Sequence, residues 1–222
     1  MLNSPTDTQP ADLPKILVLG ATGPTGRQIV SQAIARGYDV TALVRSPDKA
    51  AGLIGARIVV GDARDGNAIR KAVRGRDAVI SALGTPASPF REVTLLSTAT
   101  RALVDAMQAE GVSRLVAITG IGAGDSAGHG GFLFDNLIFP LLLRKVYADK
   151  NRQELIIENS GLDWTIVRPS ILNNKLGVKT VRALASLDNF NGGSISRGDV
   201  AAFVLDQVTS DQWLRQTPLI TW

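Results

Sequence analysis

The chain has 222 residues, 45% of them hydrophobic and 20% charged, a composition typical of a globular protein large enough for one well-packed domain. It contains no cysteine, which excludes disulfides, thiolate catalysis and cysteine-ligated metal sites and fits a reducing cytoplasm. The formal net charge of +4 comes from basic residues scattered singly among acidic ones, so we expect no nucleic-acid partner.

The first 13 residues, MLNSPTDTQPADL, are polar and contain prolines, without the basic start and apolar core of a secretory signal. We expect residues 1–13 to form a flexible tail, residues 14–222 to form one domain, and the protein to be cytoplasmic.

Short β-branched runs alternate with segments of helical periodicity along the rest of the chain. Because runs such as ILVL and IVV lack polar alternation, they indicate strands buried on both faces of a parallel sheet. The pattern predicts an α/β fold with a doubly wound parallel sheet. Strands are expected at 15–20, 39–45, 57–62, 77–84, 114–120, 163–169 and near 218–222, and helices at about 25–36, 67–74, 92–110, 142–159 and 199–208.

The most apolar segment is FLFDNLIFPLLL, residues 132–143, which Asp135, Asn136 and Pro140 interrupt. It is too short to cross a bilayer as a helix, so we expect no transmembrane segment. We predict that it is buried or lines a pocket, with docking to a partner or membrane surface as the alternative.

The glycine-rich stretch GATGPTG, residues 20–26, follows the first predicted strand and opens the first predicted helix. Such a turn aims backbone N–H groups at an anion. Gly20 would permit the turn, Gly23 would let a pyrophosphate approach the backbone, and Gly26 would let helix and strand pack closely. The spacing G-x-x-G-x-x-G differs from the common G-x-G-x-x-G, so the interpretation depends on the strand and helix around it.

The end of the second predicted strand discriminates between dinucleotides, because an acidic residue there binds a ribose 2′-hydroxyl and a basic one a 2′-phosphate. Arg45 occupies this position, followed by Ser46 and Lys49. A guanidinium matches phosphate geometry, which predicts NADP(H) rather than NAD(H). The alternative is that Arg45 is a solvated charge at a strand end.

Topology adds residues at the ends of the third and fourth strands. Asp62 is expected to meet the adenine, or else to cap the following helix. The predicted cofactor-binding residues are Gly20, Thr22, Gly23, Pro24, Thr25, Gly26, Arg45, Ser46, Lys49, Asp62, Ala63, Ala82, Leu83, Gly84, Thr119 and Lys150.

In this order, LVLGATGPTG, TALVRSPDK, VVGDARD and DAVISALGT resemble the cofactor half of the atypical short-chain dehydrogenase/reductases, above all the NmrA-like and flavin/biliverdin-reductase-like NAD(P)H-binding proteins. The segments 163–170 and 195–208 extend the likeness over nearly the whole chain from about residue 14. The resemblance implies a single Rossmann-type domain that binds NADP(H) at the glycine turn, with a small C-terminal portion on the substrate side.

Active short-chain enzymes carry Tyr-x-x-x-Lys, in which the tyrosine donates a proton and the lysine lowers its pKa. Neither tyrosine of this chain has a lysine four residues later. The nearest substitute is Tyr147 with Lys150, which share one helical face. Lys150 aligns best with the family's lysine, which leaves Val146 in the place of the tyrosine, so Tyr147 is equally consistent with a packing residue.

Thr119 ends the fifth predicted strand, where the sites of open α/β sheets gather. Its hydroxyl is a candidate to bond a substrate carbonyl or the nicotinamide amide. The candidate catalytic residues are therefore Thr119, Tyr147 and Lys150. No cluster of histidine and carboxylates has metal-ligand spacing, so no metal site is predicted.

The leading hypothesis is an NADPH-dependent reductase of a small planar acceptor, such as a flavin or quinone, with a pocket lined from Gly120 to about Leu143. An acceptor that stacks on nicotinamide tolerates the missing tyrosine. The competing hypothesis is a regulatory or sensor protein that binds NADP(H) without turnover. A sugar-nucleotide epimerase is disfavoured by the missing motif and the short C-terminal part.

Overall fold

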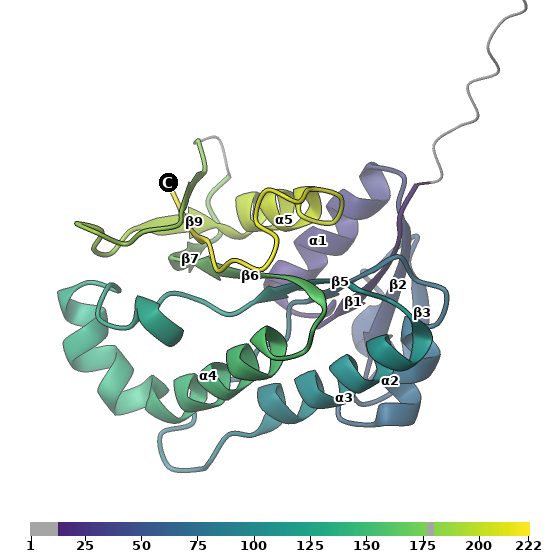
Figure 1. The fold of residues 1–222 in the computed structure, drawn as a ribbon, viewed down its shortest axis with the longest axis horizontal. Helices are drawn as coiled ribbons and strands as arrows, with labels where there is room; N and C mark the ends of the chain where they lie inside the picture. Colours follow the sequence, from purple (N-terminus) through teal and green to yellow (C-terminus); the bar gives the residue numbers. More distant parts are fainter. Residues whose placement is uncertain (1–12, 177–179) are drawn as a thin grey trace, which may run out of the picture.

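The computed structural model describes residues 13–176 and 180–222, so all of the predicted tail except Leu13 lies outside the described residues. The described part contains an eight-stranded sheet in the order β3-β2-β1-β4-β5-β6-β10-β8 and a two-stranded sheet of β7 and β9 (Figure 1). The elements are β1 Lys15–Leu19, α1 Pro24–Ala35, β2 Asp39–Val44, η1 Pro47–Ala50, β3 Arg57–Val60, α2 Gly66–Val73, β4 Ala78–Ser81, α3 Leu95–Glu110, β5 Arg114–Ile118, η2 Gly124–Ser126, η3 Phe134–Leu143, α4 Arg144–Glu158, β6 Asp163–Pro169, β7 Ile171–Asn173, β8 Arg182–Leu184, β9 Ser194–Ser196, α5 Arg197–Asp206 and β10 Leu219–Thr221.

The large sheet is parallel from β3 to β10, and its first six strands have the order of a Rossmann fold, which confirms the predicted fold class. Only β8 departs from it, since β8 pairs antiparallel with β10. The short strands β7, β8 and β9 were not predicted, because each has only three residues and no hydrophobic period to reveal it.

Two helical layers cover the sheet, with α1 and α5 on one face and α2, α3 and α4 on the other (Figure 1). Side chains of β1 alternate between the two cores: Ile16 and Val18 face the first, and Leu17 and Leu19 face the second. All four are fully buried, which explains why the strand reads as a continuous apolar run.

The apolar segment 132–143 is the main departure from the prediction. Its residues Phe134–Leu143 form the π-helix η3 directly before α4, and η3 contains no buried residue. The exposed fraction is 84% for Phe132 and 60% for Leu141. The expectation of a buried or pocket-lining segment was therefore wrong, except for Leu143, which lines the cavity described below. Among the described residues, no helix is both long and apolar enough to cross a bilayer.

Candidate functional site

A cavity of about 770 Å³ opens at the carboxyl ends of β1 and β4, where the order of the sheet reverses and ligands of open α/β sheets bind. Every predicted cofactor-binding residue lines it except Gly26, Ser46 and Lys49. The lining comprises Leu19, Gly20, Thr22, Gly23, Pro24, Thr25, Leu43, Val44, Arg45, Gly61, Asp62, Ala63, Ala82, Leu83, Gly84, Thr85, Pro86, Leu95, Ile118, Thr119, Leu143, Val146, Tyr147, Lys150, Leu172 and Arg197.

The glycines of the turn between β1 and α1 differ in what surrounds them. Gly20 has φ +75°, and a Cβ there would lie 2.3 Å from the carbonyl oxygen of Ala82. A Cβ at Gly26 would lie 2.1 Å from the carbonyl oxygen of Gly20, so Gly26 lets α1 pack against the turn. A Cβ at Gly23 would meet only the Gly20 carbonyl oxygen, at 3.3 Å. Gly23 is therefore open toward the cavity, while the other two are closed in by backbone.

The first turn of α1 is suited to an anion. Its N-cap is Gly23, which has no side chain to accept a hydrogen bond, and the turn contains no acidic residue. Helix N-termini carry free N–H groups and a partial positive charge. The open backbone at Gly23 and this uncapped turn fit the pyrophosphate of a dinucleotide.

Arg45 and Asp62 lie on the cavity wall at the ends of β2 and β3. Asp62 accepts hydrogen bonds from the Arg64 side chain at 2.8 and 3.0 Å, and this pairing lowers the pKa of Asp62 to about 2. Its proposed alternative role as a helix cap was wrong, because Asp65 caps α2 by accepting from the N–H of Asn67. Arg45 is exposed and forms no ion pair with a described residue, so its guanidinium is available to a ligand phosphate.

Ser46 and Lys49 do not line the cavity, but the loop that carries them is tied to the glycine turn. Arg27 of α1 donates to the carbonyl oxygen of Thr22 at 3.2 Å and to that of Lys49 at 2.7 Å. This bridge holds the segment after β2 against the turn, which fixes the place of Arg45.

Lys150 lies on α4 with its ammonium against the end of β5. Its Nζ donates to the backbone carbonyl oxygen of Thr119 at 2.6 Å and lies 4.5 Å from the centroid of the Tyr147 ring. Burial lowers the pKa of Lys150 to about 8, and the negative charge of Glu154 opposes that shift. With its Nζ over the ring, Lys150 contacts the face of Tyr147 and makes no hydrogen bond to its phenolic oxygen.

Tyr147 is a buried side chain on the cavity wall. Its ring packs against Phe139, with the centroids 5.0 Å apart, and against Phe134 at 6.2 Å. Burial is the largest cause that raises its pKa to about 12, and the charges of Glu154 and Asp135 add to it. At neutral pH the phenol keeps its proton firmly, which suits a packing residue better than a strong acid catalyst.

Thr119 lines the cavity, but its hydroxyl donates to Glu154 Oε1 at 2.6 Å. Glu154 is buried and receives two hydrogen bonds from Arg168, at 2.8 and 3.1 Å. Arg168 also pairs with Asp125. Because the Thr119 hydroxyl donates its proton to Glu154, its Oγ1 can accept a hydrogen bond from a ligand but does not donate one. Sequence reasoning missed Glu154 because its partners come from other elements.

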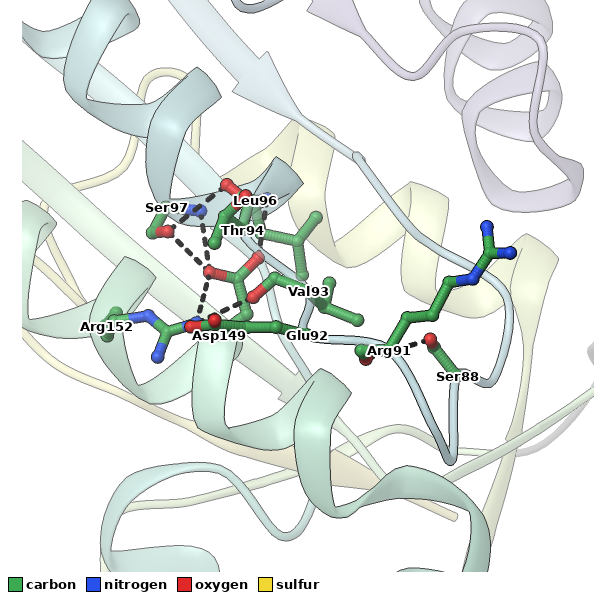
Figure 2. Close-up of polar contacts among 9 residues, drawn as sticks. All are labelled: Ser88, Arg91, Glu92, Val93, Thr94, Leu96, Ser97, Asp149 and Arg152. Atoms are coloured by element: carbon green, nitrogen blue, oxygen red, sulfur yellow. Dashed lines mark hydrogen bonds and ion pairs between the residues drawn. The ribbon is translucent and has the colours of Figure 1, made fainter.

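Asp149, which precedes Lys150, was also missed. Figure 2 shows its carboxylate pointing at the start of α3, where it accepts from the N–H of Leu96 at 2.7 Å and from the Ser97 hydroxyl at 2.5 Å. The N-cap residue Thr94 makes no side-chain cap of its own, so Asp149 replaces it. Arg152 adds a bond of 2.6 Å to the carbonyl oxygen of Val93. These contacts hold α4, and with it Lys150, against α3.

The part of the cavity next to α4 differs from the predicted lining of Gly120 to about Leu143. No residue from 120 to 142 lines it. Its apolar wall comes from Leu143, Val146, Leu95 and Leu172, and Arg197 at the start of α5 adds a cation. The prediction failed because the apolar side chains of 132–142 either face solvent, as Leu137 and Leu141 do, or pack on Tyr147, as Phe134 and Phe139 do.

The comparisons with known proteins agree with this geometry. The NAD(P)H-binding family matches the chain over residues 20–211. An uncharacterized sugar epimerase of Bacillus subtilis, YhfK, is 32% identical over 197 residues, 86% of each chain. The solved structure of ChuY, an anaerobilin reductase of Escherichia coli O157:H7, has a TM-score of 0.80 at 24% identity and covers 93% of this chain and 96% of its own. A short-chain dehydrogenase/reductase of Veillonella parvula in complex with NADP has a TM-score of 0.76 at 15% identity, over 94% of both chains. At these identities the two structures show a shared fold.

Proposed function

This chain belongs to the NAD(P)H-binding family, and on that premise we propose that it is an NADPH-dependent reductase of a small planar acceptor of the flavin or quinone type. Residues 14–222 act in this proposal as one NAD(P)-binding domain. The observation that carries it is a single cavity that joins the glycine turn and Arg45 to an apolar wall next to Tyr147 and Lys150. Dinucleotide and acceptor would therefore share one site.

The choice of NADP(H) over NAD(H) rests on Arg45. This residue lines the cavity at the end of β2, is exposed and forms no ion pair with a described residue, so its guanidinium can meet a 2′-phosphate. Asp62, the nearest carboxylate on that wall, is engaged by Arg64. The NADP carried by the Veillonella parvula structure supports the same choice.

When bound, the nicotinamide would supply a hydride to the acceptor. The ammonium of Lys150 would hold a ribose hydroxyl while it remains bonded to the Thr119 carbonyl oxygen. Leu143, Val146 and Leu172 would exclude water and offer a flat apolar surface to the acceptor. An acceptor that stacks on nicotinamide can take the proton that completes reduction from water or from a weak donor, so the raised pKa of Tyr147 does not stand against the reaction.

One observation favours a second candidate, a sensor that binds NADP(H) without turnover. The hydroxyl donors near the end of β5 are not free: the Thr119 hydroxyl donates to Glu154, and the buried Tyr147 phenol has a pKa raised to about 12. A site whose proton donors are committed within the protein can bind a dinucleotide yet lack acid catalysis.

Two measurements on the same preparation decide between these functions. Calorimetry gives the affinities for NADPH and NADH, and absorbance at the NADPH band gives its consumption with a panel of flavins and quinones. We expect NADPH to bind more tightly than NADH and to be consumed with at least one planar acceptor. Tight binding with no turnover across the panel would contradict the reductase and support the sensor, while no binding of either dinucleotide would contradict both.

A further inference from the structure

The exposed face of η3 gathers apolar side chains in one place. We call this the η3 patch. It consists of Leu137, Leu141 and Leu142 of η3 together with Phe132 and Leu133 directly before it, and these side chains are between 46% and 84% exposed. The other large apolar side chains that are exposed in the described part of the chain lie on other elements, with no more than two on any one of them, as Ile58 and Val60 lie on β3. Contiguous exposed apolar surface of this kind marks an interaction site.

The patch is presented by a helix whose other side is held in place. Phe134 and Phe139 of η3 turn toward the protein and pack against Tyr147, with ring centroids 6.2 and 5.0 Å from that ring. A Cβ at Gly122 would lie 3.3 Å from the Phe134 ring, so that ring is also in contact with the loop after β5. Because the aromatic side fixes the helix, the leucines opposite are held toward solvent.

The length of η3 determines how it can meet a lipid layer. Its 10 residues extend at most about 15 Å, against the roughly 30 Å hydrocarbon core of a bilayer. Asp135 and Pro140 also lie within it. A segment of this length cannot span the layer, but an apolar face with polar flanks can lie in the plane of the interface.

Basic residues adjoin the patch. Arg144 follows η3 directly and is exposed, and Lys145 comes next. Lys145 Nζ donates to the carbonyl oxygen of Phe90 at 2.7 Å, which brings the exposed Phe90 and Arg91 beside the start of α4. The patch therefore has a cationic border.

The nearby carboxylates do not cancel this charge. Asp135, which accepts from the backbone N–H of Gly130 at 3.3 Å, is one carboxylate against the three cations of the border. Glu92 forms an ion pair with Arg152 (Figure 2), with its Oε1 3.9 Å from Arg152 Nη2. The border of Arg91, Arg144 and Lys145 keeps a net positive charge.

We propose that the η3 patch docks on an anionic lipid surface, with its leucines in the interface and Arg91, Arg144 and Lys145 at the headgroups. Each such basic residue contributes about 1 kcal/mol near an anionic membrane. A second copy of the chain fits less well, since a two-fold contact through this patch would bring the same cations face to face. Leu143 lines the cavity, so docking places the cavity mouth next to the lipid.

The test is co-sedimentation of the full chain with vesicles of phosphatidylcholine alone or mixed with phosphatidylglycerol. We expect binding to the mixed vesicles that weakens in high salt. Leu141→Asp should lower this binding, and Arg144→Glu should lower it roughly tenfold or more. The matched control is Ile54→Asp, which replaces an apolar residue that is 85% exposed outside the patch and should bind as the parent does. Leu141 and Arg144 do not line the cavity, so an NADPH affinity equal to that of the parent shows that each variant is folded. This control needs binding only, so the test does not depend on whether the protein reduces an acceptor.

Three outcomes would overturn the proposal. The first is that the parent chain does not sediment with the mixed vesicles. The second is that it binds neutral and anionic vesicles equally and that Arg144→Glu does not change this binding. The third is a dimer in analytical ultracentrifugation that Leu141→Asp dissociates, which would assign the patch to a second copy.

Discussion

The ammonium of Lys150 donates a hydrogen bond of 2.6 Å to the backbone carbonyl oxygen of Thr119, joining α4 to the end of β5 at the cavity wall. The same ammonium lies over the Tyr147 ring, 4.5 Å from its centroid. The lysine is thus oriented by backbone and by a ring face, without a phenolic oxygen as its partner. This arrangement separates the expected roles of Lys150 and Tyr147.

We expect Tyr147→Phe to be nearly silent, because acceptors that stack on nicotinamide need no dedicated phenol. Lys150→Ala should weaken NADPH binding and lower turnover together, because it removes the group placed to hold the ribose. NADPH titration and turnover with a flavin acceptor check both variants. A loss in kcat of about 10² or more that is confined to Tyr147→Phe would instead make the phenol the proton donor.

The free energy of unfolding should depend on pH through Lys150. Burial lowers its pKa from 10.5 to about 8 in the folded protein. Between these values the unfolded chain binds more protons at this residue than the folded chain does, so stability rises with pH across that window. We expect the stability of the parent relative to Lys150→Met to be constant below about pH 7 and to increase from about pH 8 to 10. Urea unfolding at fixed pH values measures it, and parallel curves for the two proteins would refute the shift.

Cofactor preference should depend on Arg45. Replacing Arg45 with Asp puts a carboxylate where the 2′-phosphate is proposed to bind and should weaken NADPH by at least about tenfold, or 1.4 kcal/mol. NADH, which lacks that phosphate, should lose little. Calorimetry with both dinucleotides checks this, with Arg182→Asp on the exposed strand β8 as the charge-matched control. Equal losses for NADPH and NADH would remove the 2′-phosphate assignment.

Substitutions at two glycines of the turn should have different effects, one on dinucleotide affinity and the other on the free energy of unfolding. Gly23 has an ordinary extended backbone and an open side toward the cavity, so Gly23→Val should fold yet weaken NADP(H) by roughly tenfold or more. At Gly26 a Cβ would overlap backbone, so Gly26→Ala should lower the free energy of unfolding by about 2 kcal/mol. Gly66→Ala, where a Cβ meets nothing within 4 Å, is the control. NADP(H) binding by Gly23→Val at the parent affinity would place the dinucleotide elsewhere.

The capping role of Asp149 should appear as a loss of stability. Asp149→Ala leaves the N–H groups of Leu96 and Ser97 without their acceptor and should cost roughly 2 kcal/mol in urea unfolding. Asp149→Asn retains an acceptor oxygen and should cost less. Asp105→Ala on the exposed face of α3 is the control and should be close to neutral. A cost for Asp149→Ala no larger than for Asp105→Ala would show that the cap contributes nothing.

The sequence by itself determined the fold class and the residues of the glycine turn. Both depend on local pattern: buried strands such as β1 read as unbroken apolar runs, and Gly20 is needed where the chain takes φ +75° against the end of β4. The position of Arg45 on the cavity wall also follows from the sequence, because the end of a strand in a known topology has a fixed place at the sheet edge.

Only the tertiary structure decided the rest. Asp149 accepts from the N–H of Leu96, 53 residues earlier in the chain, and Arg168 pairs with Glu154 across two elements, contacts that no local pattern encodes. Arg197 reaches the cavity from α5 for the same reason. The prediction for segment 132–143 was wrong because hydrophobicity shows only that burying a side chain is favourable. Which side chains are buried depends on packing, and here Phe134 and Phe139 pack on Tyr147 while the leucines of the η3 patch stay exposed.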